Sequence, residues 1–344
     1  MKKLTIITIV LWTIIGLQNV SAQQIAALHQ SGQTTFFSGL EAFQQAYAAA
    51  ENGATIYLSG GGFLAPDSIA KTITVFGVGH HPEYTGATGQ TAVSGNMNIV
   101  MGSDDSYFEG IHFQGALEFG TNRQITNLVF RRCRIDGRIY SNSGTGNVFH
   151  IQNMLITECV LHGNNSYNLY NFRDLIITNS IIGGSFQGAL FVTIANSILL
   201  TTSTMAIWNF RNSTVKNCII VSNLSSRSTF TDNSMLNNVL FNVQSTINWG
   251  VSTVHSNNYY NVGRDNFFVD QDGAQFSYTD DYSLQSPGQY LGNDGSQAGI
   301  YGGMHPFKEG SIPMIPHVVR KSISHSIDAE GKLQVEIEVS AQDH

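Results

Sequence analysis

Charged residues are scarce in this sequence, and basic residues are the scarcest. Lys, Arg, Asp and Glu make up 12% of the chain, and the formal net charge is −7. Ordinary domains are about 25% charged. Because nucleic-acid phosphates require a basic face, we predict that no nucleic acid is a partner. Asn, Ser, Thr and Gly occupy the polar positions instead, which is typical of a protein that contacts neutral sugars and equally of a polar solenoid without a ligand.

Cysteine is also rare, with three residues in the whole chain, Cys133, Cys159 and Cys218. An odd number excludes a disulfide framework that uses every thiol. Each cysteine stands at the same place in a sequence repeat, so we interpret all three as small inward-facing core residues. A bridge between Cys133 and Cys159, on neighbouring coils, stays open as an alternative.

Long apolar runs are absent beyond the first residues, so we predict no membrane span in the mature chain. Lys2 and Lys3 precede an apolar stretch at 4–17, and Ser21 and Ala22 follow it. A basic start, a short apolar stretch and small residues at its exit predict a signal peptide over 1–22. We therefore expect export to the periplasm, the outer cell surface or the medium.

An internal repeat of about twenty residues is the strongest pattern present. Similar segments occupy 106–113, 128–135, 154–161, 175–182, 192–199, 213–220 and 233–240. Their fifth residues are Gly110, Arg132, Glu158, Asn179, Asn196, Asn217 and Asn237, and Asn257 extends the series. Each segment reads as a short strand, a polar corner, a small inward residue and a second short strand. Asn and Gly suit such corners because they tolerate left-handed backbone angles. The repeat predicts an all-β, single-stranded right-handed parallel β-helix with one continuous core.

Both ends of a solenoid need protection from edge-to-edge association. Leu40, Phe43 and Tyr47 recur at helical spacing, and they predict a capping helix over the first coil. We therefore assign 23–55 to an N-terminal segment with this helix and 56–310 to the β-helix. A Pro-containing link and a β-hairpin tail are expected over 311–344, with the tail covering the last coil or starting an appended module.

Several stretches carry a family resemblance: 53–58, 73–79, the repeated Asn-Ser and Asn-Cys coils, and a closing region over 268–303. They resemble the exported right-handed β-helix proteins of Bacteroidota, within the pectate-lyase-like superfamily. The closing region is similar to the final coils of such proteins. The resemblance implies the fold, but that fold hosts lyases, hydrolases, adhesins and other surface proteins. The enzyme signatures of these families are not found, and the acidic pair Asp104-Asp105 is interpreted as a solvated turn.

An arginine-rich coil is one candidate ligand site. Arg131, Arg132 and Arg134 lie together, with Arg123 and Arg138 close by in sequence. Guanidinium groups suit bidentate recognition of carboxylates, such as those of uronic-acid sugars. The alternative is that these arginines pair with Glu109, Glu118, Asp136 and Glu158 of adjacent coils.

A second candidate site comes from two nearly identical triplets, 171–173 and 209–211. The candidate ligands are Asn171, Arg173, Trp208, Asn209, Arg211 and Trp249. An aromatic ring beside amide and guanidinium groups is suited to sugars, provided that the side chains point outward. If Phe172 and Phe210 point inward, they are ordinary core residues.

Aspartates become more frequent toward the C-terminus of the repeat region. The weak candidates for calcium ligands are Asp270, Asp272, Asp280 and Asp281. Calcium needs six to eight oxygen ligands, yet no EF-hand spacing is present. The histidines show no metal-ligand spacing, so we expect no catalytic metal and no other cofactor. We therefore predict a non-catalytic surface protein that binds a polysaccharide or surface glycan, or serves a structural role. The alternative is a lyase that cleaves uronate-containing polysaccharides by β-elimination. The oligomeric state stays open.

Overall fold

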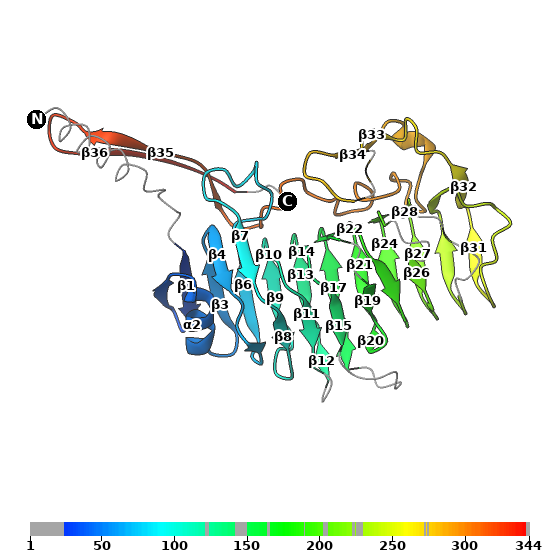
Figure 1. The fold of residues 1–344 in the computed structure, drawn as a ribbon, viewed down its shortest axis with the longest axis horizontal. Coiled ribbons are helices and arrows are strands. Elements are labelled where there is room, and N and C mark those ends of the chain that lie inside the picture. The colour runs from blue at the N-terminus through cyan, green and yellow to red at the C-terminus, as the bar shows by residue number, and fades with distance from the viewer. Residues whose placement is uncertain are drawn as a thin grey trace, which may run out of the picture.

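The computed structural model describes residues 24–120, 124–141, 150–163, 166–188, 190–201, 206–221, 224, 230–271, 273 and 275–341. The predicted signal peptide lies outside these residues. Within them, no helix is both long and apolar enough to cross a bilayer. Figure 1 shows an elongated stack of short strands, with a later part of the chain laid along one side.

Parallel sheets run the length of the stack, and successive coils contribute successive strands. The first sheet has the order β2 (Gln33–Ser38), β1 (Ile25–Gln30), β3 (Ala54–Leu58), β6 (Ile73–Phe76), β9 (Tyr107–Glu109), β13 (Val129–Arg131), β17 (Leu155–Thr157), β21 (Ile176–Thr178), β24 (Thr193–Ala195), β27 (Thr214–Lys216), β29 (Ser234–Leu236) and β31 (Val254–Ser256). From β3 onward these strands pair in parallel. The predicted parallel β-helix is confirmed.

The second sheet has the order β32 (Tyr259–Val262), β30 (Val239–Phe241), β28 (Ile219–Ile220), β25 (Ile198–Leu199), β22 (Ile181–Ile182), β18 (Val160–Leu161), β14 (Arg134–Ile135), β10 (His112–Phe113), β7 (Thr91–Ser94) and β4 (Gly61–Leu64). The third has β26 (Ile207–Trp208), β23 (Ser185–Gln187), β19 (Ser166–Asn168), β15 (Ile139–Ser141), β11 (Leu117–Phe119), β8 (Met97–Ile99) and β5 (Ser68–Ile69). A short fourth sheet joins β12 (Ile125–Thr126), β16 (Ile151–Gln152) and β20 (Phe172–Arg173).

The corner between the first and second sheets forms where the repeat places it. The fifth residue of each repeated segment has a left-handed backbone, from Gly110 at φ 72° to Asn257 at φ 53°. Arg132 and Glu158 adopt the same conformation at φ 49° and 54°. Because this conformation is unfavourable for most L-residues, the prevalence of Asn and Gly at the corner follows from backbone geometry.

The core is continuous along the stack. Phe108 and Phe130, in register on β9 and β13, stack with their ring centroids 5.0 Å apart. Cys133, Cys159 and Cys218 are buried free thiols, as their inward assignment predicted, and they form no disulfide. Side chains at the same inward position of successive coils thus pack against one another, which is how a short repeat buries its apolar face.

The N-terminal end is closed by an antiparallel hairpin, β1–β2, and by helix α2 (Ala42–Ala49). Phe43 and Tyr47 of the helix are buried, as its predicted capping role requires. Leu40 is 50% exposed and lies before the helix, so it does not share the buried face.

The chain turns back after β32, and residues 263–316 form what we call the return segment. It contains the antiparallel pair β33 (Phe268–Asp270) and β34 (Asp281–Leu284) and the short helix η1 (Pro287–Gln289). Asn293 bonds to Asn217, and Ile312 bonds to Arg132 of a much earlier coil. The closing region therefore runs back along the solenoid, whereas its sequence suggested final coils.

The tail is an antiparallel hairpin of β35 (His317–Ile327) and β36 (Leu333–Ser340). Val318, Lys321 and Ile337 border a hollow with Ser59 and Gly60, so the hairpin starts beside the first coils. It extends away from the solenoid at that end (Figure 1). The expectation that it covers the last coil is therefore wrong.

Candidate functional site

The outer face of the first sheet carries an apolar strip along the long axis. The rings of Tyr57 and Phe76 stack at 5.6 Å, and the ring of Tyr107 lies 5.8 Å from that of Phe76. Next to Tyr107, in register on the following strands, come Val129, Leu155 and Ile176. Outward positions on neighbouring parallel strands are about 4.8 Å apart, so these side chains form one continuous surface.

A groove of about 580 Å³ lies where this strip meets the return segment. The first sheet supplies its floor, and the return segment supplies its other side. The lining residues are Tyr107, Val129, Arg131, Leu155, Thr157, Glu158, Thr178, Asn179, Asn196, Asp294, Gly303, Met304 and His305. Its volume lies within the range of about 300–1,000 Å³ that is usual for small-molecule sites.

Uncharged polar groups line the corner side of the groove. The Asn179 amide donates to the carbonyls of Ile300 and Gly302, which fixes the return segment against the sheet. The Asn196 side chain is buried, and its Nδ2 has no hydrogen-bond acceptor among the described residues. A buried amide donor without an acceptor is costly, and this nitrogen lies against Gly302 and Gly303 of the return segment.

Two charged groups of the groove, Arg131 and Glu158, are paired with each other. Arg131 binds Glu158 through Nε at 2.8 Å and through a terminal nitrogen at 2.7 Å. Burial would lower the pKa of Arg131, but the charge and hydrogen bonds of Glu158 outweigh burial and raise it. Burial first, and then the neighbouring Glu109, raise the pKa of Tyr107. Both side chains therefore hold their protons firmly.

Arg132 is 1% exposed and does not reach the groove surface. It lies 2.8 Å from Glu158, 3.4 Å from Glu109 and 3.0 Å from the carbonyl of Ile312. These partners bury it beneath the return segment, so the structure corrects its assignment as a ligand contact. Arg134 pairs with Asp136 at 2.7 Å, also under the return segment. Arg131, Arg132 and Arg134 of this coil thus form ion pairs with acidic residues.

The two similar triplets, 171–173 and 209–211, contribute mainly to the core of the solenoid. Phe172 and Phe210 point inward, and Asn171 is buried with its amide donating to Ser141. Trp249 is 3% exposed and stacks on Phe230. Asn171 and Trp249 are therefore not available to a surface ligand.

The remaining members of this second set lie away from the groove. Trp208 is 36% exposed on β26 of the third sheet. Asn209 donates to the hydroxyl of Tyr170, and Arg173 lies over the ring of Phe191. Arg211 is exposed and forms parallel bridges with Leu190 and Thr231 of the neighbouring coils.

The calcium candidates do not converge on one point. Asp270 and Asp281 face each other across β33 and β34, while Asp280 accepts a hydrogen bond from Tyr282. Asp272 lies outside the described residues. Among the residues that the structure describes, no group of His, Cys, Asp or Glu side chains is arranged to hold a metal ion.

The apolar strip was missed at the sequence level, although the aligned repeats contain its signal. The second residue of successive segments reads Tyr107, Val129, Leu155 and Ile176, an outward column that stays apolar. No protein-family model, curated protein or solved structure matches this chain.

Proposed function

We propose that this protein is an exported β-helix that binds a polysaccharide in the groove of the first sheet without cleaving it. The observation that carries the proposal is the position of the apolar strip directly beside uncharged polar groups in an open groove. Sugar rings have apolar C–H faces and hydroxyl edges, so they match such a surface on both sides.

The groove favours a neutral glycan over an acidic one. Arg131 is its cation, and Glu158 already neutralises that charge. Asp294 also lines the groove, and hydrogen bonds from Ser296 oppose burial and hold the pKa of its carboxyl below the ordinary value. A uronate chain would therefore meet a carboxylate and no free guanidinium. Leu155 and Val129 would pack against a sugar ring, with Thr157 and Asn196 beside its hydroxyls.

The alternative function, a polysaccharide lyase, needs a side chain that removes a proton from the sugar. An arginine can do so only if its pKa is strongly lowered. The pKa of Arg131 is instead raised by Glu158, and that of Arg134 is raised by Asp136 against the opposing effect of burial. Both arginines are therefore better suited to structural ion pairs than to catalysis.

The test is retention of the protein, residues 23–344, on gels that contain a panel of neutral and acidic polysaccharides. Leu155→Lys places a charge on the floor of the groove and should weaken retention by at least about tenfold, or about 1.4 kcal/mol. Val254→Lys is the matched control, because Val254 occupies the equivalent outward position on β31, outside the groove. Equal retention of both variants, or no retention of the wild type, would contradict the proposal.

The same polysaccharides serve to test for lyase activity through the ultraviolet absorbance of unsaturated uronate. New absorbance that disappears in Arg131→Ala would establish the lyase and refute the non-catalytic proposal. We expect none, with or without calcium.

We further propose, from the sequence resemblance, that the chain belongs to the exported β-helix proteins of Bacteroidota in the pectate-lyase-like superfamily. The basic and apolar start of the chain supports export. N-terminal sequencing of the protein from a secreting host should find Gln23 first. An intact Met1 on a cytoplasmic product would contradict export.

A further inference from the structure

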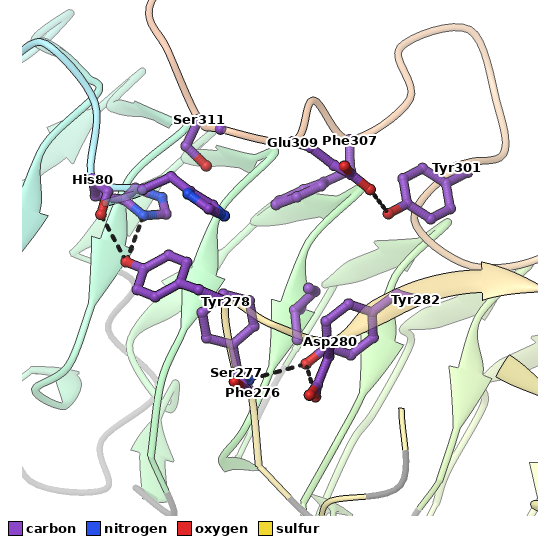
Figure 2. A pocket seen from close by; sticks show the side chains of 13 residues that line it. His80, Phe276, Ser277, Tyr278, Asp280, Tyr282, Tyr301, Phe307, Glu309 and Ser311 are labelled. Atoms are coloured by element: carbon purple, nitrogen blue, oxygen red, sulfur yellow. Dashed lines mark hydrogen bonds between the residues drawn. The ribbon is translucent and has the colours of Figure 1, made fainter. Parts of the chain in front are cut away.

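The loop that follows β6, residues 77–90, contacts residues 275–280 of the connection between β33 and β34. The contact is made by His80 and Tyr278, which are 198 residues apart in the sequence. Figure 2 shows the Tyr278 hydroxyl directed at both the backbone and the ring of His80. The ring of His81 lies edge-on to the same tyrosine, with the ring centroids 4.7 Å apart. Two histidines of an early coil thus hold one loop of the return segment.

The hydrogen bonds of His80 require a neutral imidazole. The Tyr278 hydroxyl donates to the His80 carbonyl at 2.9 Å, and the same oxygen lies 2.9 Å from His80 Nδ1. Since this hydroxyl has one proton, Nδ1 must be the donor to it, which leaves a lone pair on Nε2. Nε2 is buried and has no hydrogen-bond partner among the described residues. A proton added to Nε2 would therefore create a buried donor without an acceptor, which is costly.

The solenoid groups that face His80 also oppose a positive charge on it. The guanidinium of Arg134 lies 5.2 Å from the ring centroid of the tyrosine that His80 binds. Burial first, and then the charges of His112 and Arg134, lower the pKa of His80 well below its ordinary value. The charge of His81 lowers this pKa as well, and that of Asp136 opposes the shift. Asp136 is itself bound by His112 and Arg134, each at 2.7 Å.

The return segment places two carboxylates, Asp280 and Glu309, in the lining of the cavity beside this contact. Each accepts a hydrogen bond from a tyrosine of the same segment (Figure 2). Glu309, together with Glu83, raises the pKa of His81, but burial outweighs both and lowers it. The charges that act most strongly on His80 are instead those of the solenoid.

We propose that His80 and Tyr278 form an acid-sensitive latch, in which protonation of His80 releases the loop between β33 and β34 from the loop after β6. In the open state the imidazole reaches water, so it can carry a charge without burial beside Arg134. The opening is local, because Phe268, Tyr282 and Leu284 keep β33 and β34 packed in the second apolar cluster.

The sign of the effect follows from the pKa of His80, which is lower in the closed state than in the open state. Below about pH 6.5, the ordinary pKa of histidine, the open state binds more protons, so its population increases as the pH falls. The opening constant should rise about tenfold per pH unit, or about 30-fold between pH 6.5 and pH 5.0. Neither latch residue lines the groove of the first sheet, so this inference does not depend on polysaccharide binding.

The test is thiol labelling of Ser311→Cys in the chain 23–344. Ser311 is 1% exposed and lines the cavity beside the latch, so a thiol at this position reacts only when the latch opens. Its labelling rate with dithiodipyridine, divided by the rate of the urea-unfolded chain at the same pH, is proportional to the opening constant. We expect this ratio to be about 30-fold higher at pH 5.0 than at pH 6.5.

Adding His80→Asn keeps an N–H donor for Tyr278 but cannot take up a proton, so the ratio should no longer change with pH. Adding His325→Asn instead, at an exposed histidine of the tail hairpin, is the matched control and should leave the 30-fold change intact. Circular dichroism and the thermal midpoint establish that each variant is folded at both pH values.

Three results would overturn the proposal. The first is a labelling ratio in Ser311→Cys that does not change with pH. The second is an undiminished pH dependence after His80→Asn, which would assign the titration to another group. The third is equal labelling of the buried Cys218 at pH 5.0, which would show that acid unfolds the solenoid as a whole.

Discussion

Arg132 is the buried residue whose replacement should be most costly. It lies between two carboxylates, those of Glu158 at 2.8 Å and Glu109 at 3.4 Å, and all three side chains are 1% exposed. It also donates to the Ile312 carbonyl of the return segment at 3.0 Å. In Arg132→Met, an apolar side chain of similar length leaves both carboxylates in the interior without this cation.

Removing one partner of a buried ion pair costs about 3–5 kcal/mol, because the remaining charge is buried without compensation. Glu158 keeps Arg131 at 2.7 Å, and Glu109 still accepts from the Tyr107 hydroxyl at 2.8 Å. We therefore expect the lower end of that range, about 3 kcal/mol. The charges are nearly inaccessible to water, so solvent screening does not reduce this value.

Urea unfolding followed by circular dichroism measures the loss. Arg320→Met is the control, since the Arg320 side chain is 58% exposed and pairs with Glu336 and Glu338 on the tail. It should lose no more than about 1 kcal/mol. Adding Glu109→Gln to Arg132→Met should recover about 1 kcal/mol, because one buried charge disappears. An Arg132→Met variant as stable as the Arg320→Met control would refute the reasoning.

Two further predictions concern titration and thiol reactivity. Burial alone would raise the pKa of Asp136, but hydrogen bonds from His112 and His162, and then from Arg134, hold it well below its ordinary value. Because the pKa of Asp136 is lower in the folded protein, this group stabilises the protein above its unfolded pKa of about 3.9, and that stability is lost as the pH falls below this value. The free energy of unfolding should therefore decrease less steeply with falling pH in Asp136→Asn than in the wild type. Identical acid profiles would contradict the prediction. Burial raises the pKa of Cys218 to about 12, so the native thiol should not react with a maleimide near pH 8 until urea is added. Modification of the native protein at the rate of the unfolded chain would show that the thiol is accessible and would contradict this prediction.

The solenoid could be predicted from sequence because its repeat records backbone geometry directly. A corner with a left-handed backbone selects Asn or Gly on most coils, and the residue after it points inward and is small on most of them. Asn217, followed by Cys218, therefore marks a corner without any knowledge of distant contacts. A second column of left-handed residues, which includes Asn127 and Asn153, was not recognised because Asp, Phe and Ser replace Asn on other coils.

The return segment was not predicted, because its position depends on contacts between distant parts of the chain. A signal was nevertheless present in the apolar pairs that follow the corners, such as Ile181-Ile182 and Ile219-Ile220. A strand with one solvated face alternates apolar and polar residues, so two apolar residues in a row indicate that both faces are covered. The outward members, Ile181 and Ile219, pack in a second apolar cluster with Phe267 and other residues of the return segment.

The candidate site was predicted in part for the same reason. Arg131 was recognised and does line the groove, whereas its pairing with Glu158 depends on how two coils stack. Asn196 was identified as a corner residue, but the repeat does not reveal that its Nδ2 lacks an acceptor among the residues that the structure describes. Side-chain direction at a short strand changes with a shift of one residue, which explains why Trp208 is exposed and Trp249 is buried.

The exceptions in the corner column explain how the groove is closed. Two of the asparagine corners hold the return segment through their amides: Asn179 bonds to Ile300, and Asn217 bonds to Asn293. Arg132 and Glu158 replace asparagine on two coils although their backbone is left-handed, a conformation that costs about 1–2 kcal/mol for such residues. The cost is offset because a guanidinium reaches the Ile312 carbonyl and a carboxylate neutralises it within the same buried layer. The same column of residues thus shapes the solenoid and fixes the segment that forms the other side of the groove.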